Sequence, residues 1–101
     1  MENVISKGAY RVLCELTRET RVESALHMAL KQLLAFQKAQ AEASKISFEK
    51  KYNMNFHQFE EAWKENKISQ RYSFEVESDY AEWEAAITDL KRLEELEQWL
   101  V

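Results

Sequence analysis

Apolar residues recur along this chain at the three- and four-residue spacing of amphipathic helices. Near the N-terminus, a 4-3-4 spacing joins Ile5, Ala9, Val12 and Leu16. This stripe predicts a first helix over residues 4–18. The next few residues, up to Arg21, include no apolar side chain, so we expect a short polar turn there.

A wider apolar face follows and predicts a second helix. It comprises Val22, Ala25, Leu26, Ala29, Leu30, Leu33 and Leu34. Nothing before Tyr52 would break a helix, so we expect it to cover residues 21–52. Such a helix would be about 45 Å long, whereas a compact domain of this size is about 34 Å across. Either the protein is elongated or a second copy covers the excess, and the residues expected at a dimer interface are Val22, Leu26, Ala29, Leu30 and Leu33.

The last quarter of the chain has the apolar spacing of a helix that packs against another helix. A 4-3-4-3 spacing joins Val76, Tyr80, Trp83, Ile87 and Leu90, and further leucines follow up to Leu100. The start of this helix stays open. Ser73 could cap a helix that begins at residue 74. Alternatively, "YSFEVES" (72–78) could be a short extended piece before a cap at Ser78 or Asp79.

The stretch "KKYNMNFHQFEEAW" (50–63) has the features of a helix stop, a turn and a helix start. Lys50 and Lys51 suit the negative end of the second helix. Asn53 suits the left-handed backbone position that follows a helix, which asparagine tolerates best after glycine. We therefore expect the second helix to end at Tyr52.

The same stretch predicts a short third helix over residues 55–66. Asn55 is its expected N-cap, and Gln58 is the expected partner in a capping box. Met54 and Phe59 occupy the positions of a hydrophobic staple. Phe56, Phe59 and Trp63 would then form the inner stripe of this helix.

Composition favours an all-helical fold. The 101 residues include no proline and one glycine, whereas tight turns between strands need such residues. We predict a single all-α domain, residues 1–101, shaped as an elongated and dimeric helical bundle. Residues 1–52 would form a helix pair that dimerises, and residues 53–101 a short helix with an acidic, aromatic last helix. The expected helices are 4–18, 21–52, 55–66 and 74–100 or 79–100.

The chain has no apolar run long enough to cross a membrane and no features of a signal peptide, so we expect a cytoplasmic protein. The single cysteine, Cys14, has no partner for an internal disulfide. We expect its side chain to be buried and to pack as a small hydrophobic group. Residues 1–51 carry nine Lys/Arg against six Asp/Glu, while residues 52–101 carry five against twelve. This asymmetry favours two surfaces with different partners, although solvated helix surfaces would give the same pattern.

No catalytic or metal-binding pattern is present in the sequence. His27 shares a helix face with Glu23, and His57 lies near Glu60, but neither pair has the order and spacing of helical metal sites. The carboxylates from Glu75 to Glu84 lack a calcium-binding loop. We therefore expect no enzyme activity, cofactor, metal or small-molecule substrate, and we expect Trp63 and Trp83 to belong to the core. DNA binding by the basic first half stays open.

Two stretches resemble known proteins. "ELTRETRVESALHMALKQLL" (15–34) looks like the helix pair of small prokaryotic antitoxins of the VapB and ribbon-helix-helix groups. "FEKKYNMNFHQFEEAW" followed by "YSFEVESDYAEWEAAITDL" resembles short cyanobacterial and archaeal proteins with a "FEKKYGMSFEEFE" segment, which are the antitoxins of TumE/TumA-type pairs. The resemblance covers residues 15–95. Asn53 departs from the family's glycine.

The resemblance implies a type II antitoxin that dimerises through its N-terminal helix pair and covers a small toxin with its acidic last helix. The residues implied in toxin binding are Phe74, Glu75, Glu77, Asp79, Tyr80, Glu82, Trp83 and Ile87. Acidic charge and aromatic anchors agree with this role, because toxins that bind RNA are basic. A homo-oligomeric helical scaffold is the alternative. An enzyme with sites between chains and a DNA-binding regulator are further hypotheses.

Overall fold

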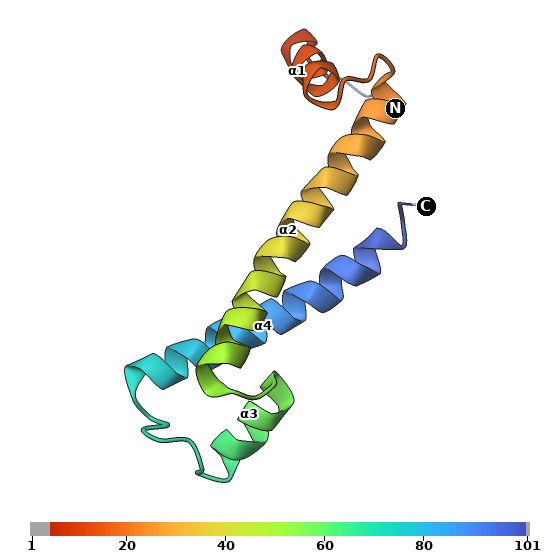
Figure 1. Cartoon of the computed structure of the whole chain (residues 1–101). Helices are drawn as coiled ribbons and strands as arrows, with labels where there is room; N and C mark the ends of the chain where they lie inside the picture. The colour runs from red at the N-terminus through yellow and green to blue at the C-terminus, as the bar shows by residue number, and fades with distance from the viewer. Residues whose placement is uncertain (1–4, 101) are drawn as a thin grey trace.

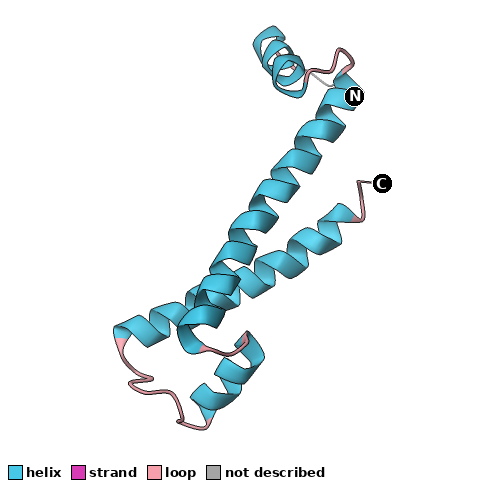
Figure 2. Cartoon of the chain, in the orientation of Figure 1, coloured by secondary structure: helices cyan, strands magenta, loops and turns pink. Residues whose placement is uncertain are grey.

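The computed structural model describes residues 5–100, and these residues form four helices joined by turns (Figures 1 and 2). The helices are α1 (Lys7–Thr17), α2 (Val22–Tyr52), α3 (Phe56–Lys64) and α4 (Phe74–Glu97). No strand occurs among the described residues. The radius of gyration is 19.4 Å, against about 13 Å for a compact chain of this length, and the extents are 56 × 27 × 25 Å. The predicted all-helical, elongated fold is confirmed.

The long helix α2 determines this shape. It runs without a break over 31 residues, which corresponds to about 46 Å. In Figure 1, α1 lies at the N-terminal end of α2, while α3 lies at its C-terminal end and α4 crosses it. None of the helices in the described part of the chain is long and apolar enough to span a membrane.

A short polar side chain caps the start of α1, and a left-handed residue follows its end. The helix starts at Lys7, because the Ser6 side chain accepts a hydrogen bond from the Ala9 amide at 3.1 Å. Val4, the start expected from the sequence, lies outside the described residues. The helix ends one residue before the expected Arg18, which adopts the left-handed conformation with φ 58°. At the next helix, Arg21 is the N-cap rather than the first helical residue.

The joint between α2 and α3 agrees with the sequence prediction. Asn53 follows α2 in the left-handed conformation, with φ 55° and ψ 42°. Asn55 caps α3 through a capping box with Gln58, whose two hydrogen bonds measure 2.8 and 2.9 Å. Met54 packs against the core cluster that contains Phe59, as expected for a hydrophobic staple. The helix itself ends at Lys64, two residues earlier than expected.

The start of α4 settles the alternative left open by the sequence. The Ser73 side chain accepts a hydrogen bond from the Val76 amide at 3.2 Å, and the helix begins at Phe74. The extended piece over residues 72–78 and the later start at residue 79 are therefore wrong. Acidic residues at the second and fourth helical positions favour this earlier start, because they complement the positive end of the helix. The helix ends at Glu97, before the expected residue 100.

The main core lies at the end of the molecule where α2, α3 and α4 meet. Its fully enclosed side chains are Phe59 and Trp83, and Val76 is also buried. Half-buried hydrophobic residues pack around them: Phe48, Tyr52, Met54, Phe56, Trp63, Ile68, Tyr80 and Ile87. The predicted core positions of Trp63 and Trp83 are confirmed.

Replacing Asn55 with alanine is expected to cost about 1 kcal/mol of unfolding free energy, because the amide bonded to its side chain loses its partner. Urea denaturation followed by circular dichroism measures this difference. His57→Ala, at an exposed position in the same turn, is the matched control and should change stability by less than about 0.5 kcal/mol. Equal midpoints for Asn55→Ala and the unmodified protein would contradict the assigned cap.

Candidate interaction surfaces

The structure places Trp83, an expected toxin-binding anchor, inside the chain's own core. Its exposed fraction is 0%. The ring lies 5.0 Å from that of Phe59 and 5.6 Å from that of Phe48, measured between centroids. Trp83 is therefore removed from the partner-facing surface, and a substitution there would disturb folding before it tested binding.

Two of the expected partner-facing carboxylates instead hold α4 against the end of α2. The Lys51 ammonium group donates hydrogen bonds to Asp79 at 2.6 Å and to Glu75 at 2.8 Å. The Tyr52 hydroxyl donates to the same Asp79 oxygen at 2.6 Å. The Asp79 side chain is only 13% exposed, so it serves as an internal acceptor, whereas Glu75 remains largely accessible.

The environment of this cluster raises the pKa of its donors. Partial burial, followed by the hydrogen bond to Asp79, raises the pKa of Tyr52 to about 12. The bonds to Asp79 and Glu75 raise the pKa of Lys51 above its ordinary value. On the other side of the core, the Tyr80 hydroxyl donates to Glu60 at 2.7 Å, and burial and this bond raise its pKa to about 12.

The connection between α3 and α4 is held by Arg71, which the sequence did not indicate. Its guanidinium group donates to the Trp63 carbonyl oxygen and stacks 5.0 Å from the Trp63 ring. In return, the Trp63 indole donates to the Arg71 carbonyl oxygen at 3.2 Å. This reciprocal pairing compensates for a connection in which Asn66 and Gln70 adopt positive φ angles without any glycine.

Part of the expected partner surface does remain on the outside. Phe74, the first residue of α4, is 86% exposed, and Tyr72 beside it is also exposed. The acidic residues Glu77 and Glu82 lie exposed on the same helix. Tyr80 and Ile87, by contrast, are half-buried and pack against the core. The start of α4 therefore has exposed aromatic residues as well as exposed carboxylates. Tyr72, which the sequence did not indicate, also contacts the Arg71 guanidinium group, which lies 4.6 Å from its ring centroid.

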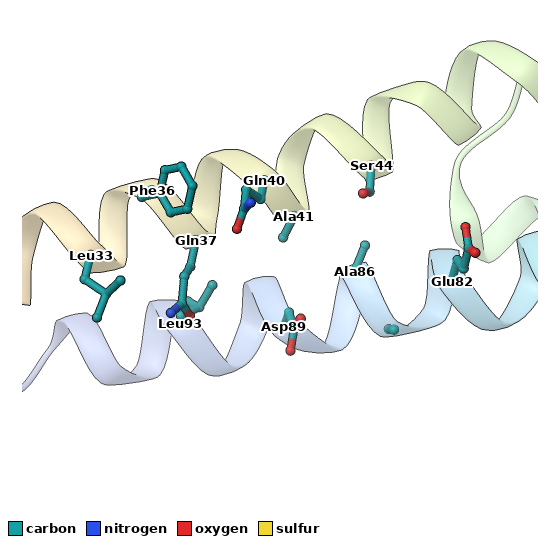
Figure 3. Close-up of a pocket in the computed structure, with 11 residues that line it drawn as sticks. Leu33, Phe36, Gln37, Gln40, Ala41, Ser44, Glu82, Ala86, Asp89 and Leu93 are labelled. Carbon is teal, nitrogen blue, oxygen red and sulfur yellow. The ribbon is translucent and has the colours of Figure 1, made fainter.

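The residues expected at a dimer interface lie on the N-terminal half of α2, away from the main core. Leu26, Leu30 and Leu33 are exposed, while Val22 and Ala29 are half-buried. A groove of about 470 Å³ lies between α2 and α4, and Leu33 is also one of the residues that line it. Figure 3 shows Ala41 and Ala86 pointing toward one another across this groove, with Leu33 and Leu93 nearer its left end.

The apolar stripe of α1 is also uncovered. Its exposed members Val12 and Leu16 lie four residues apart, and Leu16 is 74% exposed. The half-buried residues of the helix are Leu13, Cys14 and Thr17, on a different face. Cys14 is therefore half-buried, whereas we expected it to be fully buried. Helix α1 packs against α2 and leaves its apolar stripe in solvent.

The histidines lie at the surface. His27 and His57 are both exposed. Within residues 5–100, no group of three or more His, Cys, Asp or Glu side chains is arranged to hold a metal ion. The features of the described chain that stand out are therefore its exposed apolar and acidic surfaces.

Alkaline pH should weaken the fold through the tyrosines of the core. Their unfolded pKa is about 10 and their folded pKa is about 12, so the stability they contribute is complete below pH 10 and is lost as pH rises toward 12. The stability that the ion pairs of Lys51 contribute is likewise lost as pH rises. We expect the urea midpoint of the double variant Tyr52→Phe/Tyr80→Phe to fall less between about pH 9 and about pH 11 than that of the unmodified protein. An equal fall in both proteins would contradict this role of the hydroxyls.

Comparison with known proteins adds no assignment to this geometry. No protein-family model, curated protein or solved structure matches the chain. The resemblance to small antitoxins therefore rests on the sequence motifs described above, and the exposed surfaces are the structural observations that bear on function.

Proposed function

We propose that this protein is a non-catalytic protein-binding module, an antitoxin that neutralises a small cognate toxin. The observation that carries the proposal is the exposed start of α4, where Phe74 is followed by the exposed carboxylates of Glu75 and Glu77. Aromatic side chains surrounded by polar residues are typical of the positions that contribute most to binding. The motif resemblance supplies the kind of partner.

Charge supports a basic partner at this end of the molecule. Residues 52–101 carry twelve Asp/Glu against five Lys/Arg. Asp79 and Glu75 form ion pairs with Lys51 of the same chain. Glu77 and Glu82 are exposed and remain available to a partner. Complementary charge accelerates association and discriminates against acidic competitors. A small toxin that binds RNA has the positive surface that such a site would select.

A homo-oligomeric scaffold is the second candidate, and a different observation favours it. The exposed leucines of α2 lie at the other end of the molecule from Phe74, and they would suit a contact with another helix. In that case the acidic end of α4 would have no toxin to bind.

Co-expression with the product of the adjacent gene tests the toxin-binding proposal. If that gene encodes a small basic toxin, the chain should restore growth and co-purify with it. The variant Phe74→Ser should raise the dissociation constant at least tenfold, which corresponds to about 1.4 kcal/mol or more. The matched control is Leu16→Ser, an exposed apolar residue on α1, which should leave the constant unchanged.

The possible results separate two failures. Lack of rescue and lack of a complex would reject the antitoxin proposal and leave the scaffold as the better hypothesis. A complex whose dissociation constant does not respond to Phe74→Ser, with an unchanged circular dichroism spectrum, would instead reject the start of α4 as its binding surface.

A further inference from the structure

The groove between the middle of α2 and α4 has the dimensions of a seat for another helix (Figure 3). Along α2 its lining extends from Leu33 to Ser44, which corresponds to about 16 Å, or three helical turns. The small side chains of Ala41 and Ala86 form its floor. Helices pack with their axes about 8–10 Å apart, and small side chains at the contact permit the closer approach. A third helix can therefore rest on this floor between the two walls.

The formal charges that line this groove are all negative. On the α4 wall, Glu82 and Asp89 are both exposed, whereas the α2 wall has the neutral polar side chains of Gln37, Gln40 and Ser44. The two carboxylates are seven residues apart, so they lie on the same face of α4 about 10 Å from one another along its axis. A partner helix that carries Lys or Arg at two positions seven residues apart would face both carboxylates, and complementary charge would favour its binding.

The chain itself does not hold these two carboxylates firmly. Asp89 lies 3.6 Å from Arg92 on the next turn, and both side chains of this pair are more than half exposed. Surface pairs of this kind contribute little to stability. Among the described residues, Glu82 forms no ion pair. Asp79 on the same helix differs from both, because Lys51 binds it at 2.6 Å. The groove carboxylates therefore remain available to a cationic partner.

The groove also continues the surface that the proposed function assigns to the toxin. Phe74, Ser78, Glu82, Ala85 and Asp89 follow a 4-4-3-4 spacing, so they share one face of α4. The first and last of them are about 22 Å apart along the helix. A single elongated element can therefore contact the aromatic residue at the start of α4 and both carboxylates of the groove.

We propose that the toxin is bound through an amphipathic helix, which lies along α4 from Phe74 and occupies the groove between α2 and α4. This inference rests on the proposed antitoxin function and specifies the element of the toxin that is recognised. Small apolar residues of that helix pack on the alanine floor, while two Lys or Arg seven positions apart pair with Glu82 and Asp89. Laying an amphipathic helix into a groove is a general mode of protein recognition.

Helix α1 of a second copy fits the groove less well than a helix of the toxin. Its exposed basic residues Lys7 and Arg11 are four positions apart rather than seven. They also lie roughly 140–180° around the helix from the exposed Leu16. A helix cannot direct two opposite faces at once to the floor of a groove and to one of its walls. The groove therefore calls for a helix whose basic and apolar residues are neighbours.

Removing the two carboxylates tests the charge pairing in the complex of the full-length chain with the product of the adjacent gene. The double variant Glu82→Gln/Asp89→Asn should raise the dissociation constant about tenfold, because two ion pairs are lost. The matched control Glu84→Gln/Glu95→Gln removes the same charge from exposed positions of α4 outside the lining. It should change the constant by less than about twofold, since distant surface charges are screened.

Filling the groove tests the packing without a change of charge. Ala85 lines the groove and is exposed. Ala85→Trp should therefore leave the circular dichroism spectrum unchanged and raise the dissociation constant more than the carboxylate variant does. Ala39→Trp, at an exposed position of α2 outside the lining, is the matched control and should leave the constant unchanged.

Charge reversal tests whether the bound element of the toxin is a helix. Glu82→Lys/Asp89→Lys should prevent formation of the complex, because like charges then face each other. A toxin variant with glutamate at two basic positions seven residues apart in one helix should restore it. If no pair with this spacing restores binding, the helical element is overturned.

The results distinguish failure of the groove from failure of the antitoxin function. Absence of a complex with the unmodified chain would reject both. A complex that is weakened by Phe74→Ser, but by neither Ala85→Trp nor the carboxylate variant, would leave the antitoxin function in place and overturn the groove. If Ala85→Trp alters the sedimentation of the isolated chain, the occupant is a second copy, and the proposal is overturned as well.

Discussion

The fold depends on the indole ring of Trp83, where three helices meet. Its centroid lies 5.6 Å from that of Phe48 and 5.8 Å from that of Tyr52, both on α2. From α3, the rings of Phe56 and Phe59 approach to 5.5 and 5.0 Å. The direction of α4 and the docking of α3 are therefore both fixed by one side chain, and the polar contacts of Lys51 and Tyr80 lie around the edge of this cluster.

Because the main core lies at one end of the molecule, few large side chains are buried at the other end. Away from Trp83, α2 and α4 meet through small residues, Ala41 and Ala86, and through Leu93 near the end of α4. Only three large side chains are fully buried in the described chain: Trp83, Phe59 and Leu93. A domain of this size has little stability to spare even when its core is well filled. Covering the apolar half of α2 with another protein would therefore contribute to the stability of this chain as well as to its assembly.

The sequence predicted the features that depend on a few neighbouring residues. The left-handed Asn53 and the capping box of Asn55 were identified correctly, because each involves groups within three or four positions. The start of α4 could not be decided from the sequence, since Ser73 and Ser78 have the same capping chemistry. Packing of Val76 into the core also favours the earlier start, and that contact is made with residues distant in the sequence.

The features of the candidate site that the sequence did not resolve have the same physical origin. Periodicity placed Trp83 on an apolar seam but could not tell whether the seam faced the chain's own helices or a partner. The carboxylates of α4 resembled a single acidic surface, yet Lys51 and Asp79, 28 residues apart, meet only in the folded chain. The sequence did not indicate the role of Arg71, because its guanidinium group donates hydrogen bonds to main-chain carbonyl groups. No residue pattern reveals such acceptors.

The structure separates two exposed surfaces along α4. This helix has 24 residues, so its ends are about 36 Å apart. Phe74 lies at one end, beside the core, whereas Leu96 near the other end borders the groove between α2 and α4. A dimer formed through α2 would leave Phe74 accessible in both copies. Dimerisation through the exposed leucines of α2 and toxin binding at Phe74 would then not compete.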